Sequence, residues 1–215
     1  QQQMKIMAAQ AAIKYITSPL ILGVGTGTTI AYFIDLLITV KDKIKATVAS
    51  SQQTAQLLKA RGFEVIDLNM IDELPLYIDG ADSYNKVKQL VKGGGGALTR
   101  EKILATVSKK FICIVDQTKP DILDKVPVPV EVLAMARSYV AREIVKLGGQ
   151  RQLRENYITD NGNLILDVHN WQITEPIKLE LTLNNIPGVI ENGLFALRNA
   201  DQIIIGTNSS IKIIN

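Results

Sequence analysis

Residues 74–107 read LPLYIDGADSYNKVKQLVKGGGGALTREKILATV and place a strand, a polar loop and a helix in succession. The apolar run at 74–78 predicts a buried strand, and the acids Asp79 and Asp82 follow it almost directly. Lys92 then precedes four consecutive glycines, behind which a helical pattern begins. Glycine loses more entropy on folding than any other residue, so a run of glycines indicates a backbone that turns tightly or approaches a ligand. The combination favours a functional site over scaffolding.

Glu101 stands one turn inside the predicted helix, and its neighbours at i−4, i−3, i+3 and i+4 are all apolar. These neighbours are Ala97, Leu98, Leu104 and Ala105. We expect the carboxyl to lie at the edge of an apolar face, which would raise its pKa and suit a general base. Each feature alone has an ordinary alternative: Asp79 and Asp82 could cap a turn, the glycines could form a plain loop, and Glu101 could be a first-turn acid.

A second glycine-rich turn, GVGTGTT at 23–29, follows a predicted strand at 20–22 and leads into a helix. Amides at a helix N-terminus point outward and carry partial positive charge, so this arrangement suits a phosphate. Thr28 stands where a dinucleotide motif has its third glycine, no acid follows the next strand at Ser50-Ser51, and the Walker lysine is absent. A phosphate monoester is therefore the favoured ligand, with a plain strand-to-helix turn as the alternative.

Strands and helices alternate through the first part of the chain. The further predicted elements are helices at 4–16 and 52–60 and strands at 46–49, 63–67 and 111–115. Such alternation predicts a parallel sheet with right-handed crossovers. GTGTT, ASS, DGAD and DQTK all fall at the carboxyl ends of predicted strands. These segments should therefore converge on one crevice.

The composition shifts at 125–129, where a second pattern begins. It consists of the strand VPVEV, a helix at 133–147, a hairpin around DNGN at 160–163, a helix at 176–186 and a strand within 189–196. This β-α-β-β-α-β order is ferredoxin-like. Residues 202–206 form an apolar strand that we assign to the first sheet. The predicted fold is α/β: a Rossmann-like domain of residues 1–125 and 201–215, with a smaller ferredoxin-like α+β domain of residues 126–200.

Composition narrows the function classes. One histidine, His169, and one cysteine, Cys113, exclude a zinc site built from these residue types. His169 and Trp171 follow the hairpin and are expected to serve packing or an interface. Cys113 lies in the apolar run FICIV, which predicts a buried thiol and fits a reducing compartment, here the cytoplasm. The N-terminal stretch lacks the apolar core of a secretory signal.

Charge and hydropathy bear on the partners. The net charge is +3, the basic residues are scattered among acids, and aromatics make up 5% of the chain. A nucleic-acid surface usually combines clustered basic residues with stacking aromatics, so no nucleic-acid partner is expected. No apolar run approaches the roughly 18 residues needed to span a bilayer, so no membrane partner is expected either.

Six segments together resemble the type A ribose-5-phosphate isomerases, in the same order and over essentially the full chain. They are GVGTGTT, DGAD, KGGGGALTREK, PVEV…MAR, TDNGN and IPGV…GLF. The resemblance implies an aldose–ketose isomerase of the pentose phosphate pathway that interconverts ribose 5-phosphate and ribulose 5-phosphate. It further implies no metal and no organic cofactor, and a homodimer or homotetramer, with the smaller domain as the oligomerisation region.

The same resemblance implies roles for individual residues. Glu101 is the expected base, moving a proton between C1 and C2, while Asp79, Asp82 and Lys92 assist ring opening and hold the sugar oxygens. The other implied substrate-binding residues are Thr26, Gly27, Thr28, Thr29, Gly80, Ala81, Gly93, Gly94 and Gly95, with Lys119 and Lys5 at the phosphate. Two positions depart from the family pattern. Ser83 follows DGAD where the family usually has an acid, and Thr28 replaces the serine of GTGST while keeping a hydroxyl.

Two other classes are compatible with this architecture. A non-catalytic sugar-phosphate sensor would carry a DNA-binding module ahead of the sheet, whereas 19 residues precede the first predicted strand. A coenzyme A transferase of related fold would use a glutamate as nucleophile and would have no use for the DGAD and KGGGG segments. Trapping with hydroxylamine would distinguish such a transferase from an isomerase.

Overall fold

The computed structural model describes residues 1–215, which divide into two compact units. The first unit consists of Gln1–Ala81, Arg100–Lys119 and Ala200–Asn215, and the second of Asp82–Thr99 and Pro120–Asn199. The expected division had placed residues 82–99 in the first domain. They group instead with the second unit because their short strands pair with a segment near residue 194.

The first unit is built on a six-stranded sheet with the order β13-β12-β6-β3-β1-β2. The strands are β1 (Leu20–Val24), β2 (Ile44–Ala49), β3 (Leu74–Asp79), β6 (Ser108–Asp116), β12 (Gln202–Gly206) and β13 (Ile211–Ile214). All neighbours pair in parallel except β12 and β13, which are antiparallel. The predicted parallel sheet is confirmed, as is the return of residues 202–206 to it beside β6. The edge strand β13 was not predicted.

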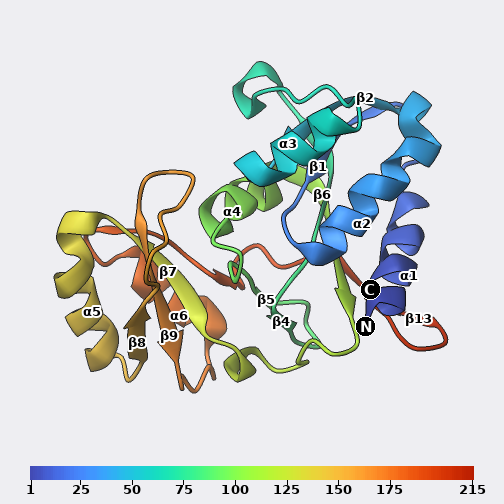
Figure 1. Cartoon of the computed structure of the whole chain (residues 1–215). Coiled ribbons are helices and arrows are strands. Elements are labelled where there is room, and N and C mark those ends of the chain that lie inside the picture. Colours follow the sequence, from blue (N-terminus) through green and yellow to red (C-terminus); the bar gives the residue numbers. More distant parts are fainter. The chain divides into compact units, whose positions relative to one another are not determined.

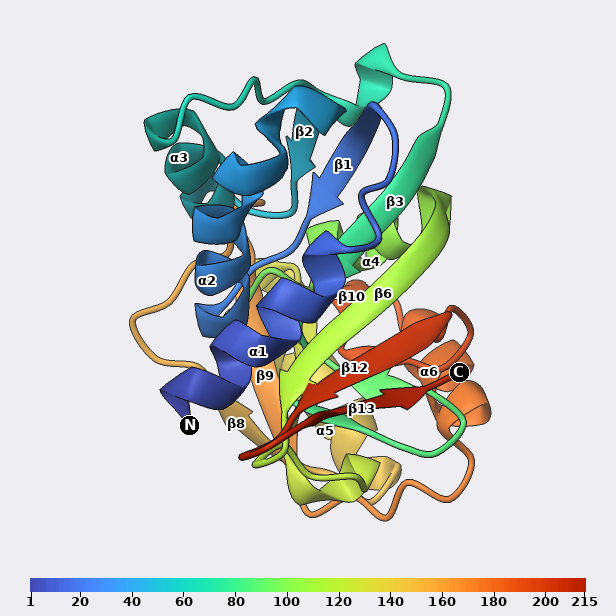
Figure 2. The ribbon, with the colours of Figure 1, turned by 90° about the vertical axis from the view of Figure 1, so that its right-hand side faces the viewer.

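Helices α1 (Gln2–Ile13), α2 (Thr28–Leu36) and α3 (Gln52–Ala60) belong to the first unit, and α4 (Leu98–Val107) enters it at Arg100. Figure 2 shows α1 crossing β6 and β12 on one face of the sheet, with α2 beside it. Small side chains permit this close packing, since Ala8, Ala9 and Ala12 are all fully buried. The core beneath them is apolar and includes Phe33 and Ile114.

The strand predicted at 63–67 is wrong. Only Val65 forms a bridge there, to Thr47 of β2, at the edge of the sheet. The carboxylate of Asp67 then accepts a hydrogen bond from Asn69 N at 2.8 Å and caps the short 3-10 helix Leu68–Met70. The extended pairing is therefore limited to the bridge at Val65 and the two backbone hydrogen bonds beside it, from Thr47 N to Glu64 O and from Ile66 N to Thr47 O.

The second unit contains a four-stranded antiparallel sheet with the order β10-β7-β9-β8. Its elements are β7 (Val128–Val132), α5 (Arg137–Lys146), β8 (Gln150–Leu153), β9 (Leu164–His169), α6 (Pro176–Asn184) and β10 (Val189–Asn192). This is the predicted β-α-β-β-α-β order. Helix α5 packs against β8 and β9 (Figure 1), and α6 packs against β10. The DNGN turn lies at the end of the longer loop 154–163 rather than directly between the two strands.

A small three-stranded sheet completes the second unit and was not predicted. It consists of β4 (Ser83–Tyr84), β5 (Leu90–Val91) and β11 (Leu194–Phe195), with β5 in the middle. Strands of two residues are too short to show an alternating pattern in sequence. This sheet precedes the glycine run directly, because Lys92 follows β5 and its N–H donates to Gly193 O at 2.9 Å.

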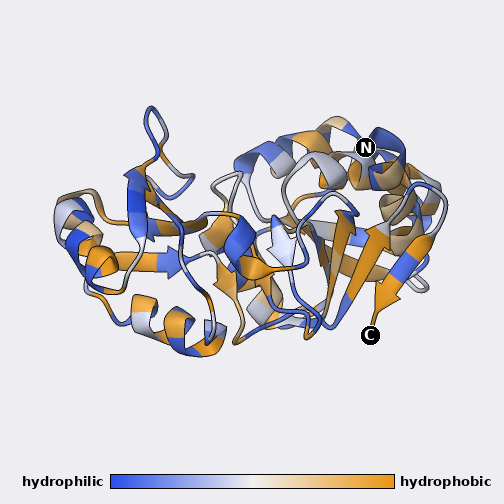
Figure 3. Ribbon diagram, turned by 90° about the horizontal axis from the view of Figure 1, so that it is seen from below, coloured by the Kyte–Doolittle hydropathy of each residue, from blue (hydrophilic) through white to orange (hydrophobic).

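The distribution of hydropathy follows the sheets. The strands beside the C-terminus are dominated by hydrophobic residues, while the helices alternate hydrophobic and hydrophilic positions (Figure 3). None of the helices combines the length and the apolar character that crossing a bilayer would require.

Candidate active site

Asp79, the last residue of β3, is fully buried, and its carboxylate accepts hydrogen bonds from three donors. Its Oδ1 accepts hydrogen bonds from Thr26 N at 3.0 Å and Gly80 N at 2.7 Å, and its Oδ2 accepts one from the Tyr77 hydroxyl. A Cβ on Gly25 would lie 1.9 Å from Oδ1, so only glycine leaves room for this carboxylate. The glycine turn after β1 is therefore shaped around the acid at the end of β3.

Tyr77 is also fully buried, and burial raises its pKa well above the ordinary tyrosine value. The negative charges of Asp79 and Glu101 raise that pKa further. Its phenol therefore remains protonated and serves as a hydrogen-bond donor to the carboxylate of Asp79.

Side chains from three strand ends meet at Thr26. Its Oγ1 lies 2.7 Å from Ser50 Oγ and 2.8 Å from Ser51 Oγ, both directly after β2, and 3.2 Å from Thr54 Oγ1. Together with the Thr26–Asp79 bond, these contacts confirm that the ends of β1, β2 and β3 converge. The hydroxyl of Thr26 is thus surrounded by other hydroxyls of the protein.

The predicted phosphate turn lies at the start of α2. Gly27 precedes the helix with a φ of +124°, and no acidic residue occurs in the first turn. The ammonium of Lys5, on α1, donates to Thr28 Oγ1 at 2.6 Å. A cation thus stands beside the free amides of a helix N-terminus, where anions are favoured. Thr29, the next residue, is buried.

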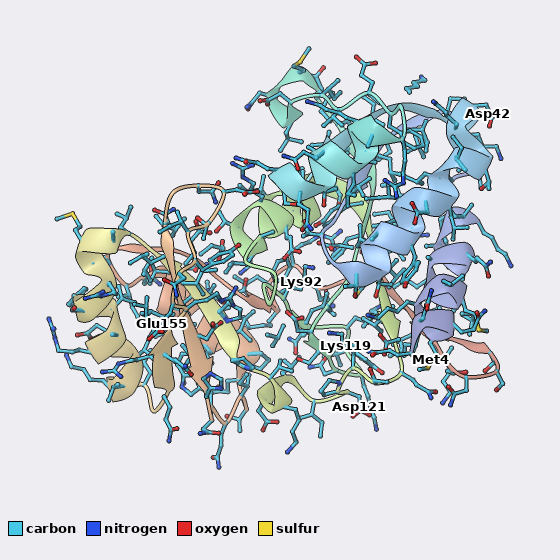
Figure 4. All side chains as sticks on the ribbon, in the orientation of Figure 1. Met4, Asp42, Lys92, Lys119, Asp121 and Glu155 are labelled. Carbon is cyan, nitrogen blue, oxygen red and sulfur yellow. The ribbon has the colours of Figure 1, made fainter.

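The DQTK turn follows β6. Asp116 is fully buried and organises this turn by accepting from Thr118 N at 3.0 Å, while the N–H of Lys119 donates to Asp116 O at 3.1 Å. Gln1, at the beginning of α1, donates through its side chain to Thr118 Oγ1 at 3.0 Å. Lys119 emerges from this turn and is partly exposed (Figure 4).

Glu101 lies in the first turn of α4 and is only 4% exposed. Its predicted helical neighbours Leu98, Leu104 and Ala105 are buried too. The raised pKa expected for this carboxyl stays a prediction.

Asp82, Lys92 and the glycine loop belong to the second unit. Asp82 Oδ2 accepts from Gly94 N at 2.7 Å, so the acid holds the loop directly. Lys92 is 2% exposed, and its ammonium lies 5.6 Å from the centroid of the Phe195 ring (Figure 4). Gly93 has a φ of +97°, and a Cβ there would lie 2.8 Å from Leu98 Cβ, so glycine is required at this position.

Sequence reasoning missed two residues that hold the glycine loop, both in the loop 154–163 (Glu155 in Figure 4). Arg154 donates to Gly93 O at 3.4 Å and Gly94 O at 3.2 Å, and also forms a two-pronged ion pair with Asp167. Tyr157 donates through its hydroxyl to Gly95 O at 3.0 Å. Neither residue stands in a pattern that would have marked it.

Three further expectations concern single residues. Trp171 is buried and its Nε1 donates to Leu147 O at 3.0 Å, so its predicted packing role is confirmed. Cys113 is a buried thiol that forms no disulfide, as expected. Ser83, which stands in place of the family's acid, is fully buried in β4, and its Oγ has no hydrogen-bond partner.

The predicted residues thus form two groups. The first unit holds Asp79, Glu101, Lys119, Lys5, the turn 26–29 and the linker Gly80-Ala81. The second unit holds Asp82, Lys92 and Gly93, Gly94 and Gly95. The chain passes between the two units four times: after Ala81, within α4, after Lys119 and after Asn199.

A mostly parallel Rossmann-like sheet, with a glycine turn at a helix N-terminus after its first strand, and a separate unit of ferredoxin-like order define the fold class of this protein. The chain belongs to the ribose 5-phosphate isomerase A (phosphoriboisomerase A) family, whose model matches residues 46–210. It is an aldose–ketose isomerase of the pentose phosphate pathway. The sensor and coenzyme A transferase alternatives are not favoured.

Individual relatives agree over nearly the full length. Ribose-5-phosphate isomerase A of Francisella tularensis subsp. novicida is 55% identical over 211 residues, covering 98% of this chain and 94% of the relative. The crystal structure of ribose 5 phosphate isomerase A from Neisseria gonorrhoeae has a TM-score of 0.96 at 43% identity, covering 98% and 95% of the two chains. A D-ribose-5-phosphate isomerase in complex with phospho-erythronic acid has a TM-score of 0.95 at 37% identity, covering 100% and 98%.

Proposed function

We propose that this chain isomerises D-ribose 5-phosphate and D-ribulose 5-phosphate through an enediolate, with Glu101 as the single base. In the open-chain aldose the carboxylate would take the proton from C2, and the electron pair would move toward the carbonyl oxygen at C1. Return of the proton to C1, with transfer of a hydroxyl proton from O2 to O1, gives the ketose. The observation that carries this role is the burial of the Glu101 side chain in the first turn of α4, which suits a carboxyl tuned for proton transfer.

Lys92 and the glycine-loop amides would stabilise the negative charge that develops on the enediolate oxygens. Lys92 is almost fully buried, and a cation in a water-poor site stabilises charge far better than one in water. Asp79 and Asp82 would hold the sugar hydroxyls and assist ring opening. In support, Asp79 is fixed by three donors, and Asp82 is tied to the loop through Gly94.

The substrate phosphate would bind at Thr26, Gly27, Thr28 and Thr29, with Lys5 and Lys119 supplying charge. The Lys5–Thr28 contact at the start of α2 supports this placement. The complex of the relative with phospho-erythronic acid supports a phosphorylated sugar as the class of substrate, because that ligand is a phosphorylated sugar acid. Gly80, Ala81, Gly93, Gly94 and Gly95 would line the sugar through their backbone groups.

We further propose a homodimer or homotetramer that acts in the cytoplasm without nucleic-acid or membrane partners, with residues 126–200 as the oligomerisation domain. Exposed apolar side chains of the second unit, such as Met135 at 94% exposure, support the assembly. The buried thiol of Cys113, which forms no disulfide, fits a reducing compartment. Light scattering on the purified protein measures the assembly directly.

The test of the base is Glu101→Gln, which keeps the side-chain shape but cannot take a proton. We expect kcat for ribose 5-phosphate to fall by at least about 10²-fold with the fold intact. Glu155→Gln, at an exposed loop position, is the matched control and should retain wild-type turnover. Near-normal turnover by a folded Glu101→Gln protein would refute the role of Glu101.

A further inference from the structure

The PVEV and TDNGN motifs, which the isomerase mechanism leaves without a role, meet at the side chain of Glu131. This residue lies on β7 and is fully buried. Its Oε1 accepts three hydrogen bonds, from Thr159 Oγ1 at 2.7 Å, Asn161 Nδ2 at 3.1 Å and Asn163 Nδ2 at 2.9 Å. Three donors of the TDNGN segment therefore converge on one carboxylate oxygen.

The other oxygen of Glu131 faces the start of α4. Oε2 accepts a hydrogen bond from the hydroxyl of Thr99. Thr99 is the second residue of α4, two positions before Glu101. Hydrogen bonds to an ionised acceptor are about twice as strong as those between neutral groups, so this bond holds the first helical turn firmly.

We propose that Glu131 is a positioning residue for the isomerisation: through Thr99 it fixes the first turn of α4 and hence the direction of the Glu101 side chain. The TDNGN donors hold Glu131 in turn, so the loop 154–163 orients the base without touching substrate. The inference rests on the proposed role of Glu101 as the base. A misplacement of about 1 Å can reduce a rate by about 10²-fold, so a single bond at this turn is enough to matter.

A second buried carboxylate in the same unit provides the comparison. Glu180, on α6, is 1% exposed, and its Oε2 accepts from Ala196 N at 2.8 Å and Leu197 N at 2.9 Å. Those bonds fix the segment that follows β11 and do not involve α4. Removing the charge of Glu180 should therefore weaken the fold without changing the orientation of Glu101.

The decisive variants are Thr99→Val, which keeps the shape of the side chain but loses the hydroxyl, and Thr99→Ser, which keeps the hydroxyl. We expect kcat of Thr99→Val to fall by about tenfold or more, with KM changed by less than about threefold. Thr99→Ser should restore kcat to within about twofold of wild type. The acid limb of the kcat–pH profile should move in Thr99→Val, because the surroundings of the base change, and should not move in Glu180→Gln.

Each result decides the proposal. Wild-type kcat in a folded Thr99→Val protein, or failure of Thr99→Ser to restore it, overturns the positioning role. If Thr99→Val does not fold, Thr99→Ala replaces it, because alanine also lacks the hydroxyl that donates to Glu131 and is a better helix former than valine. A loss of kcat with KM retained then supports the proposal, and wild-type kcat overturns it. Glu101→Gln in the same assay distinguishes failure of the base assignment from failure of the positioning role. If Glu101→Gln stays active, Glu101 is not the base. If Glu101→Gln is inactive and Thr99→Val has wild-type kcat, only the positioning role of Glu131 fails.

Discussion

At the scale of single residues, Asp79 shows how a buried charge is made tolerable. A carboxylate without partners is expensive to bury, and Asp79 has backbone donors at Thr26 and Gly80 and a phenol donor at Tyr77. The neighbouring position, Gly25, has no side chain to displace it. The carboxylate of Asp79 therefore constrains two other positions: glycine at 25, which leaves room for it, and tyrosine at 77, which donates to it.

Tyr77→Phe removes the phenol donor from Asp79 and should lower the free energy of unfolding by about 1.5–3 kcal/mol near neutral pH. Folding raises the pKa of this phenol, so above about pH 10 the unfolded chain loses a proton that the folded protein keeps. Stability contributed by Tyr77 is thus present below about pH 10 and declines above it. Urea unfolding of both proteins across this range should show a constant difference that narrows in strong alkali, and a widening difference would contradict the assignment.

Lys119→Ala tests the phosphate contact. The phosphate is remote from C1 and C2, so its contacts should be similar in the ground state and the transition state, and should mainly affect KM. We expect a rise in KM for ribose 5-phosphate that clearly exceeds any fall in kcat. Inhibition by a phosphorylated sugar acid should weaken more than inhibition by its unphosphorylated counterpart. Lys45→Ala, at an exposed position of β2, is the control, and equal losses for both inhibitors would exclude Lys119 as a phosphate ligand.

At the scale of elements, the glycine loop at 93–96 depends on a second loop for its shape. Glycines permit the required backbone angles but do not select them, because each leaves many other conformations open. Selection comes from the side chains that bind the loop, namely Asp82 at Gly94 N, Arg154 at two carbonyls and Tyr157 at Gly95 O. The smaller unit therefore preorganises the loop that we propose binds the sugar.

Arg154→Lys tests this preorganisation. A lysine carries the same charge but lacks the planar fork that binds Asp167 in two places while reaching Gly93 and Gly94. We expect kcat/KM to fall by about tenfold, or about 1.4 kcal/mol, with a smaller proportional effect on stability. Arg151→Lys, at an exposed position on the neighbouring strand β8, should be neutral. Full activity in Arg154→Lys would show that the loop holds its shape without the guanidinium.

At the scale of the whole molecule, the proposed mechanism draws its charge stabilisation from the chain itself, through Lys92 and the amides of the glycine loop. Turnover should therefore survive exhaustive treatment with EDTA. The quantity to measure is the isomerisation rate at saturating ribose 5-phosphate, before and after dialysis against EDTA. Loss of activity that a divalent cation restores would show that the electrostatic role assigned to Lys92 is wrong.

The amino-acid sequence by itself determined the elements and their order. Apolar runs, helical periodicity and glycine turns are local properties, and they predicted the parallel sheet, the ferredoxin-like order and the position of Glu101 at the edge of an apolar helix face. The same dependence on local sequence explains why some strands were missed and one was predicted wrongly. The strands β4, β5 and β11 are too short to show a period, and the extended run at 63–67 is ended by the cap at Asp67.

Only the tertiary structure decided which distant side chains hold the site in shape. Thr99 and Glu131 are 32 positions apart in sequence, and Arg154 is 61 positions from Gly93. No periodic signal links such residues, because a hydrogen bond between two loops depends on how the intervening strands and helices pack. The sequence could mark Glu101 and Lys92 by their residue types and spacing, whereas the shell that orients them emerges only when the chain is folded.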